Sequence, residues 1–385
     1  MMFQNTALSL SVVLMSGCQA KLKQMDFMDW KQGAELPSAN GKEQSIGVAG
    51  PLVGVYNDYL LVAGGANFPD ALPWDGGTKA YHDDAFLFQK DNGQLCIYGS
   101  SLKIPEPLAY AAVCSTPIGI VVAGGENLSG ITAKASLVSW SSNPDSLQII
   151  SLPELPIALT NASAVAIGTK IYLAGGETAE KSSNKFFSLD LEQRNKGWAN
   201  LQSVPHPVSH AIFVYNANHS NLYLAGGRRK NADGISTIYS AMYSYDPASN
   251  RWDEEISLPY AISAGTGFSS GGQIVLTGGD KGVVFNQTEQ LIAAIKTAKD
   301  RNAQAALTEQ KNKLQASHPG FSREILVYHI RDKRWEKAGS LPFETPVTTT
   351  AVQMGDDIIL PSGEIKAGIR TPNIMMGRIN NANPQ

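Results

Sequence analysis

Charged side chains are scarce in this chain of 385 residues, at 17% of the total, and neither sign dominates. The 31 basic and 34 acidic residues leave a formal net charge of −3, which argues against a nucleic acid as partner. Long apolar runs are missing too. The apolar run at 7–15 is too short for a membrane-spanning helix. Cysteine occurs only three times.

Hydrophobic residues and glycine are plentiful instead. The first make up 43% of the chain, which allows a large core and argues against disorder. The 36 glycines, without a dominant long amphipathic pattern, favour many short strands joined by tight turns.

The segment 1–20 has the features of a signal peptide. Its apolar run at 7–15 is followed by small residues, although residues 1–6 contain no Lys or Arg. We expect export and a periplasmic location. Ordinary cleavage after Ala20 and lipid attachment at Cys18, in a sequence that resembles a bacterial lipobox, both remain open. Contact with a membrane is expected only through such a lipid.

One strand pattern recurs six times. Five copies end in Gly-Gly (LLVAGG, IVVAGG, IYLAGG, LYLAGG and IVLTGG), and a sixth, IILPSG, keeps only the second glycine. The second glycines are 51 to 60 residues apart until a last interval of 84, which contains a polar, helix-favouring stretch at 287–317. Without this insertion the period is regular, as in repeat folds. These glycines stand at positions 65, 125, 176, 227, 279 and 363.

Each period contains the same series of strand segments. A small-residue strand precedes the Gly-Gly strand, a third segment alternates apolar residues, and a fourth follows a tryptophan or an equivalent residue and leads into Leu-Pro. Four short strands in roughly 50 residues are typical of a propeller blade. We therefore predict an all-β, six-bladed kelch-type β-propeller that forms a single domain over residues 21–385, with a helical insertion at 287–317.

The two ends of the chain predict how the ring closes. The sixth period supplies a third strand at 373–380 but no tryptophan strand, and the missing segment stands at 29–37. We expect these N- and C-terminal strands to pair in one blade. The same layout places Cys96 on an outer strand and Cys114 on an inner one. Export would permit a disulfide, but this separation favours two buried free thiols.

Residues that follow the glycine pairs are expected to converge on one mouth. In an up-and-down blade the second and fourth strands end on the same face, and the glycines allow a close approach to the axis. A mouth lined by carboxylates, amides and guanidinium groups suits a small hydroxyl-rich ligand, although such groups could also simply pair with one another. The set comprises Ala66, Asn67, Glu126, Glu177, Arg228, Asp280 and Glu364, joined by Tyr110, Asn161, Ser209, His210 and 348–350 ahead of the first strands.

The segment 361–372 has the most specific local pattern. Glu364 leaves the strand at the mouth, and Gly368 permits a turn that can return Arg370 towards it. The two could form a plain salt bridge. Alternatively, Arg370 could hold a ligand carboxylate through its planar fork while Glu364 moves a proton. A long loop at 66–77 is expected to wall the pocket.

The stretch Ser-Gly-Glu-Ile-Lys-Ala-Gly-Ile-Arg at 362–370 resembles the Gly-Glu-x-Lys-x-Gly-x-Arg signature of the bacterial N-acetylneuraminate epimerases, or sialic acid mutarotases. The polar insertion and the loop after Gly65 are similar too, and the likeness covers essentially the whole mature chain. Two features differ from the better-known members. Their signature blade lies mid-chain, so this sequence resembles a cyclically permuted mutarotase branch, and Ala367 stands where they carry proline. A closed ring tolerates permutation when the cut falls in an exposed connection.

The resemblance implies an exported enzyme that interconverts the α and β anomers of free N-acetylneuraminate, a small sugar acid. It implies Glu364 as the proton acceptor and Arg370 as its essential partner. Ring opening to the ketone and reclosure require no metal, nucleotide or redox cofactor, and no strong motif for one is present. The next candidates for substrate contacts, chosen by position alone, are Arg228, Asp280, Asn67, Glu177 and Glu126.

Proteins with two other functions contain the same kind of repeat. One is a non-catalytic kelch propeller that binds a carbohydrate or a protein through its loops; the polar mouth argues against a protein partner. The other is a copper radical oxidase of the galactose-oxidase kind, but the six histidines are scattered and only His82, His206 and His210 fall near predicted mouth loops. For the insertion at 287–317, a solvated surface excursion, a helical lid and a homodimer contact stay open.

Overall fold

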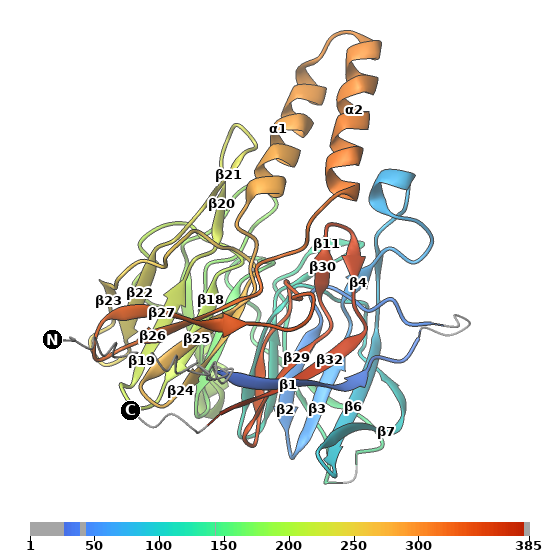
Figure 1. Ribbon diagram of the computed structural model, residues 1–385. Helices are drawn as coiled ribbons and strands as arrows, with labels where there is room; N and C mark the ends of the chain where they lie inside the picture. Colours follow the sequence, from blue (N-terminus) through green and yellow to red (C-terminus); the bar gives the residue numbers. More distant parts are fainter. Residues whose placement is uncertain (1–26, 39–43, 143, 381–385) are drawn as a thin grey trace, which may run out of the picture.

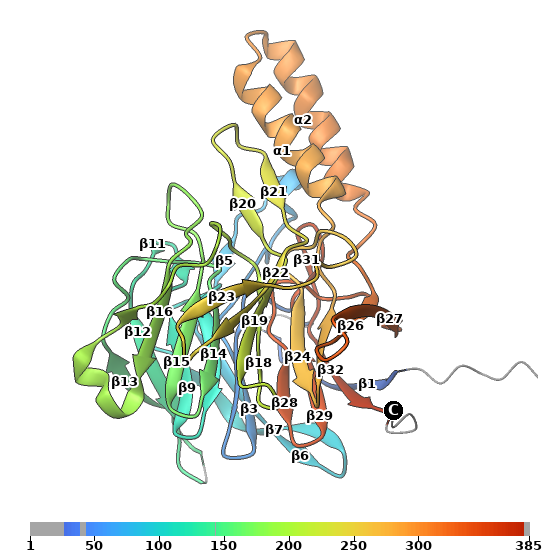
Figure 2. The same cartoon turned by 90° about the vertical axis from the view of Figure 1, so that its left-hand side faces the viewer.

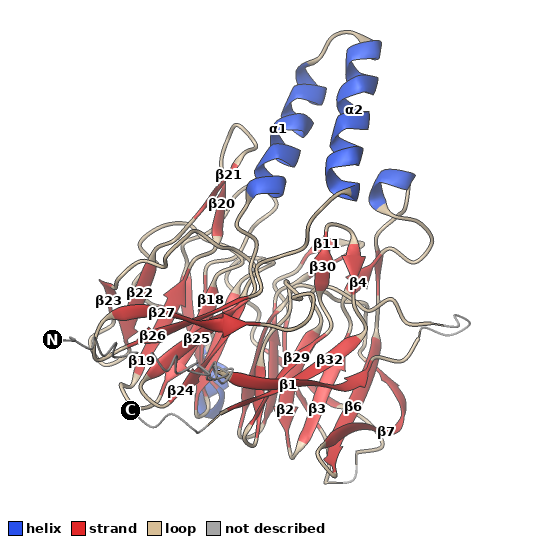
Figure 3. Ribbon diagram, in the orientation of Figure 1, coloured by secondary structure: helices blue, strands red, loops and turns tan. Residues whose placement is uncertain are grey.

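The computed structural model describes residues 27–38, 44–142 and 144–380. It consists of six four-stranded antiparallel sheets around a central axis, with two long helices at one end (Figures 1 and 3). This is the six-bladed β-propeller that the repeat predicts. Within the described ranges no helix is both long and apolar enough to cross a membrane. The expected signal peptide at 1–20, with Cys18, lies outside the described residues.

The strands of blades 1 to 3 follow the chain from the axis outwards. Blade 1 contains β2 (Leu52–Tyr56), β3 (Tyr59–Ala63), β6 (Asp84–Asp91) and β7 (Gln94–Lys103). Blade 2 contains β8 (Ala112–Thr116), β9 (Gly119–Ala123), β12 (Ala135–Ser139) and β13 (Gln148–Leu152). Blade 3 contains β14 (Ser163–Ile167), β15 (Lys170–Ala174), β16 (Phe186–Asp190) and β17 (Ala199–Asn200), with the short helix η2 (Leu191–Lys196) between the last two.

Blades 4 and 5 repeat this order, and blade 6 combines both ends of the described chain. Blade 4 contains β18 (Ile212–Asn216), β19 (Asn221–Ala225), β22 (Met242–Asp246) and β23 (Arg251–Glu254). Blade 5 contains β24 (Thr266–Ser270), β25 (Gln273–Thr277), β26 (Glu324–His329) and β27 (Arg334–Ser340). Blade 6 contains β28 (Val352–Met354), β29 (Asp357–Pro361), β32 (Asn373–Ile379) and β1 (Met28–Glu35).

Pairing of β1 with β32 closes the ring as predicted. The two strands run antiparallel, with Met28 opposite Ile379 and Trp30 opposite Gly377. A Cβ atom on Gly377 would lie 2.7 Å from the indole ring of Trp30, so glycine is needed for the tryptophan to lie flat against its partner strand. Apolar residues between successive blades form the core, in which each sheet buries both faces against its neighbours.

The Gly-Gly pairs let each blade touch the next at the mouth. Gly64 and Gly65 have φ of 61° and 89°, and the Gly65 N–H donates to the Leu108 carbonyl of blade 2 at 2.8 Å. A Cβ on Gly64 would lie 2.3 Å from that carbonyl oxygen. In blade 6 Ser362 takes the first position at φ 54°. Its hydroxyl accepts from the Val48 N–H at 2.9 Å and bonds to backbone carbonyls nearby, which compensates for the strained backbone.

Short ribbons continue on the mouth face from three of the glycine pairs and from the Ser-Gly pair of blade 6. They carry several of the residues that sequence analysis placed at the mouth, and they stand at the same end as the helices (Figure 2). The ribbons are β4 (Ala66–Asn67) with β5 (Ala80–Tyr81), β10 (Glu126–Asn127) with β11 (Gly130–Ile131), β20 (Arg228–Lys230) with β21 (Ser236–Ile238), and β30 (Glu364–Lys366) with β31 (Ile369–Arg370).

The insertion forms a helical hairpin above this face. Helix α1 (Val283–Thr297) begins before the expected boundary at 287, and α2 (Arg301–Ala316) follows. Glu289 on α1 accepts hydrogen bonds from the backbone N–H and hydroxyl of Ser236 in β21, at 2.6 and 2.9 Å. On the other side, Asn312 of α2 donates to the carbonyl of Trp74 in the short helix η1 (Pro73–Asp75) at 3.2 Å. The hairpin therefore contacts two loops of the mouth.

Both remaining cysteines are free thiols, as predicted. Cys114 is buried in β8, and burial raises its pKa to about 12. The expectation that both are buried is wrong for Cys96, which is exposed. Cys96 lies on β7, the outer edge strand of blade 1, where no further strand covers it.

Candidate functional site at the propeller mouth

A closed circle of backbone hydrogen bonds surrounds the axis at the mouth. One residue per blade donates its N–H to the carbonyl oxygen of its counterpart in the preceding blade, at 2.7 to 3.1 Å. All six have φ between 52° and 63°, the left-handed region. We call these residues the axial ring: Gly50, Tyr110, Asn161, His210, Ala264 and Thr348.

Next to the axial ring, the first residue after each glycine pair forms a backbone bridge with the residue that precedes a ring position. The structure thus brings five of the predicted polar residues into equivalent positions around one opening. Asn67 lies one position beyond such a bridge. The bridges are Ala49–Ala66, Ala109–Glu126, Thr160–Glu177, Ser209–Arg228, Ser263–Asp280 and Val347–Glu364.

Glu364 and Arg370 face each other across the β30–β31 ribbon, as the sequence predicts. The Gly368 N–H donates to Glu364 Oε1 at 2.7 Å and fixes the carboxylate. Arg370 Nη2 lies 3.8 Å from Glu364 Oε2, which is an ion pair but too long for a hydrogen bond. The pair therefore leaves hydrogen-bonding capacity on both groups.

Arg370 has buried hydrogen-bond donors without acceptors. Its side chain is only 5% exposed, and its guanidinium lies over the Phe68 ring at 4.8 Å. Its Nε and Nη1 have no hydrogen-bond partner among the described residues. Leaving charged donors buried and unpaired is costly, so the arrangement favours a ligand that brings acceptor oxygens. Phe68 belongs to the loop at 66–77, which therefore walls this part of the site.

Tyr110 connects this pair with a second acidic group. Burial raises the pKa of Tyr110 to about 12 against the opposing effect of Arg370, so the phenol stays protonated at neutral pH. The Lys79 ammonium lies 5.3 Å from the centre of the Tyr110 ring and 3.2 Å from Glu126 Oε1. Tyr81 also donates to Glu126 Oε1, at 2.8 Å. Glu126 is thus held by two partners at the mouth.

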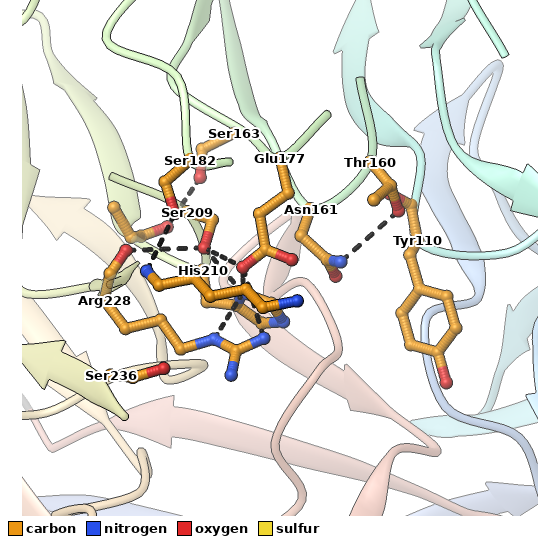
Figure 4. A network of polar contacts seen from close by, with 12 residues as sticks. Tyr110, Thr160, Asn161, Ser163, Glu177, Ser182, Ser209, His210, Arg228 and Ser236 are labelled. Carbon is orange, nitrogen blue, oxygen red and sulfur yellow. Dashed lines mark hydrogen bonds and ion pairs between the residues drawn. The ribbon is translucent and has the colours of Figure 1, made fainter. Parts of the chain in front are cut away.

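Glu177 anchors a network between blades 3 and 4 (Figure 4). It accepts from the Ser209 hydroxyl at 2.6 Å, and Arg228 Nη2 lies 3.2 Å from the same oxygen. Arg228 Nε donates to His210 Nδ1 at 3.3 Å. Burial, together with the Arg228 charge, holds the pKa of His210 well below its usual value. His210 is therefore neutral, with its proton on Nε2.

Asp280 and His318 lie at the base of the helical hairpin. Burial raises the pKa of Asp280, although the Gly282 N–H donates to its carboxylate at 2.7 Å. His318 is only 7% exposed, and burial lowers its pKa even though Asp280 and Glu364 both act on it electrostatically in the opposite direction. The Gly320 N–H donates to His318 Nδ1 at 3.0 Å, so the neutral ring carries its proton on Nε2.

His318 corrects the sequence analysis, which placed only His82, His206 and His210 near the mouth. The residue was missed because it follows a 16-residue helix, and nothing in the local pattern shows where that helix returns the chain. The His-Pro-Gly turn at 318–320, directly after the helix, was the available signal.

Asn67 differs from the other candidates because both ends of its amide are already bonded. Its Nδ2 donates to the Gly47 carbonyl at 2.8 Å, and its Oδ1 lies 2.8 Å from His82 Nε2. The side chain is 6% exposed. Asn67 thus joins the first loop to the segment before β2, and no contact links its side chain to Glu364 or Arg370 within the described ranges.

The opening of the axial ring leads into a channel of about 480 Å³ along the propeller axis. Its walls are the inner strands of the blades and the ring residues, whereas the charged side chains of the mouth are not part of its lining. In the part of the chain that the structure describes, no group of three or more His, Cys, Asp or Glu side chains is arranged to hold a metal ion.

Comparison with known proteins identifies the family of this chain. Residues 152–385 match the family model described as N-acetylneuraminate epimerase. The chain belongs to the N-acetylneuraminate epimerase family. An N-acetylneuraminate epimerase of Haemophilus influenzae (strain PittEE) is 26% identical over 234 residues, which make up 59% of each chain. One from Brucella melitensis biotype 1 is 27% identical over 231 residues, 59% of this chain and 58% of that protein.

The sequence match to these epimerases spans only 59% of the Haemophilus protein's length. The structural likeness extends further. The solved structure of YjhT superposes with a TM-score of 0.62, covering 91% of this chain and 97% of that one at 14% identity. At that identity the superposition supports the shared propeller fold alone.

Proposed function

We propose that this protein is a mutarotase that interconverts the α and β anomers of N-acetylneuraminate at the propeller mouth. The observation that carries the proposal is the buried guanidinium of Arg370, whose Nε and Nη1 lack acceptors among the described residues while its Nη2 lies 3.8 Å from Glu364 Oε2. A planar carboxylate pairs with two parallel N–H donors on one edge of a guanidinium, and each such edge combines Nη2 with either Nε or Nη1. N-acetylneuraminate has its carboxylate on the anomeric carbon, so binding it to Arg370 places the reacting atoms beside Glu364.

Glu364 then serves as the proton carrier. Mutarotation moves one proton from the anomeric hydroxyl to the ring oxygen, the carbon–oxygen bond of the ring breaks, and the anomeric carbon becomes a ketone. One carboxylate that first accepts the proton and then donates it completes this balance. After rotation of the ketone, reversal of the same steps on its other face forms the second anomer. Each transfer by a positioned group contributes typically about 10²–10⁴-fold.

The neighbouring residues fit a hydrogen-bonding role in this scheme. Tyr110, with its pKa raised to about 12, and His318, with its pKa lowered, both stay neutral at neutral pH. Because both stay neutral there, they favour Glu364 as the group that carries the proton. Both can donate hydrogen bonds to oxygens that gain charge as the ring opens.

We also propose that the chain is a cyclic permutant of the better-known family members. The family match is confined to 152–385, whereas the likeness of fold covers 91% of the chain. Met28 lies opposite Ile379, so a short linker can join the ends. A chain that begins at 154, in the connection after β13, and carries 27–153 after residue 380 is expected to fold and keep its activity. Failure of that rearranged chain to fold would count against the permutation.

The alternative is a propeller that binds the sugar acid without converting it. The decisive experiment is a proton NMR time course of freshly dissolved N-acetylneuraminate α anomer. Native protein is expected to speed equilibration, Glu364→Gln to reduce the enzymatic rate by about 10²–10⁴-fold, and Glu309→Gln, on the exposed side of α2, to match the native protein. Binding without acceleration by the native protein would favour the alternative, and absence of both would refute both functions.

A further inference from the structure

The axial ring imposes the same strained backbone on every blade. Closing the circle of hydrogen bonds requires φ near +55° at each ring position, a region in which glycine is unstrained and most other residues are not. Of the six ring positions, only position 50 holds a glycine. The other five positions hold residues with side chains, among them Tyr110, His210 and the β-branched Thr348. Strain of this kind persists only where the surrounding structure enforces it, and here the closed circle of hydrogen bonds does so.

The folded chain leaves hydrogen-bonding groups on two of these side chains unused. His210 accepts from Arg228 at Nδ1, and its Nε2–H has no partner among the described residues. Asn161 donates from Nδ2 to the Thr160 hydroxyl at 3.3 Å, and its Oδ1 has no partner within the same ranges. Both residues line the opening of the axial channel. One therefore presents a donor and the other an acceptor at the rim.

The order of the blades determines how far Asn161 and His210 lie from Arg370 around the ring. Tyr110 lies close enough to Arg370 for the two side chains to interact electrostatically. Asn161 donates its backbone N–H to Tyr110, and His210 donates to Asn161, so the three occupy consecutive positions around the ring. Figure 4 shows Tyr110, Asn161 and His210 along this arc. A ligand fixed at Arg370 and extending along the arc meets the free groups of Asn161 and His210.

We propose that Asn161 and His210 bind the hydroxyl-bearing part of the ligand and so select a polyhydroxylated sugar acid over a short keto acid. This rests on the proposed function, because it assumes that the ligand carboxylate occupies Arg370. A hydroxyl group can donate to Asn161 Oδ1 and accept from His210 Nε2–H, which matches alternating hydroxyls along a carbohydrate chain. The backbone that the ring imposes at both positions holds these groups at the rim.

Replacement by glycine separates a ligand role from a structural one. Asn161→Gly and His210→Gly keep the ring backbone and relieve the left-handed strain. Asn161→Gly is expected to leave the thermal midpoint unchanged or raised, whereas His210→Gly also removes the acceptor of Arg228 Nε and is compared by affinity alone. Each variant is expected to bind the sugar acid roughly two- to tenfold more weakly, the value of one hydrogen bond. Ala264→Gly makes the same backbone change without removing a polar group, so it should match the native affinity.

The readouts are the thermal midpoint, the KM for mutarotation and the Kd for N-acetylneuraminate by calorimetry. An analogue that lacks the terminal hydroxylated carbons should bind native protein and both glycine variants equally. Unchanged affinity for the full sugar, the same loss for the analogue, or a lowered midpoint in Asn161→Gly would each overturn the inference. If native protein binds the sugar but does not convert it, the proposed mutarotase reaction is refuted, while the Kd comparison still tests whether Asn161 and His210 bind the sugar. If native protein does not bind the sugar, both fail.

Discussion

Lowering the pH from 7 to 5 is expected to destabilise the fold, with a defined share arising from His210. Burial and the charge of Arg228 keep this imidazole neutral in the folded protein, and Nδ1 is occupied by the Arg228 Nε–H at 3.3 Å. In the unfolded chain the ring is protonated below a pKa of about 6.5. Below that pH the unfolded state binds one more proton than the folded state, so stability falls as the pH falls.

The size of the effect follows from this difference in proton binding. Each pH unit below the unfolded pKa removes about 1.4 kcal/mol per group, so His210 accounts for about 2 kcal/mol between pH 7 and pH 5. His82, His206 and His318 have pKa values shifted in the same direction and add to the total slope. A comparison between the native protein and a His210 variant isolates its share.

His210→Asn is the suitable variant. Asparagine tolerates the left-handed backbone, and its Oδ1 can replace Nδ1 as acceptor for Arg228. Urea denaturation followed by tryptophan fluorescence at several pH values measures both proteins. The loss of unfolding free energy between pH 7 and 5 is expected to be about 2 kcal/mol smaller in the variant, with parallel curves from pH 7 to 8. Equal losses in both proteins would refute the inferred neutrality of His210.

Three further changes test the fold around the mouth. Gly377→Ala places a Cβ 2.7 Å from the Trp30 ring and is expected to lower the free energy of unfolding by roughly 1–3 kcal/mol in urea denaturation; an unchanged midpoint would contradict the closure geometry. Glu289→Ala removes both hydrogen bonds to Ser236, so amide exchange in 283–297 should become faster while the blades keep native protection. Ser362→Ala keeps the strained backbone but loses the hydroxyl that bonds to the neighbouring segments, so the free energy of unfolding should fall by roughly 1–3 kcal/mol in the same assay. Ser362→Gly also loses these bonds but relieves the strain, so its free energy of unfolding should fall by less.

The propeller was predictable because its geometric requirements are repeated in the sequence. Gly-Gly recurs where a Cβ would collide with the next blade, as Gly64 does with the Leu108 carbonyl. The same logic predicted that β1 completes blade 6, since one strand of the sixth period was missing. It also predicted the return of Arg370 towards Glu364, because both lie on one short ribbon closed by Gly368.

The parts of the site that depend on distant segments were not predictable in this way. His318 reaches the mouth only because two helices return the chain to their starting point, and helix periodicity does not encode that direction. The amide of Asn67 is occupied by Gly47 and His82, which are partners that no local spacing reveals. Arg370 Nε and Nη1, which have no partner in the part of the chain that the structure describes, lie beneath Phe68 from a loop about 300 residues earlier in the sequence.

A crystal structure of the Glu364→Gln variant with N-acetylneuraminate tests the central claim most directly. The account predicts that the carboxylate of the sugar lies within hydrogen-bonding distance of one edge of the Arg370 guanidinium, at Nη2 and either Nε or Nη1, with the anomeric carbon beside residue 364 and hydroxyls at Asn161 and His210. A sugar bound elsewhere on the propeller, or bound at the mouth with the Arg370 nitrogens still unpaired, would contradict it.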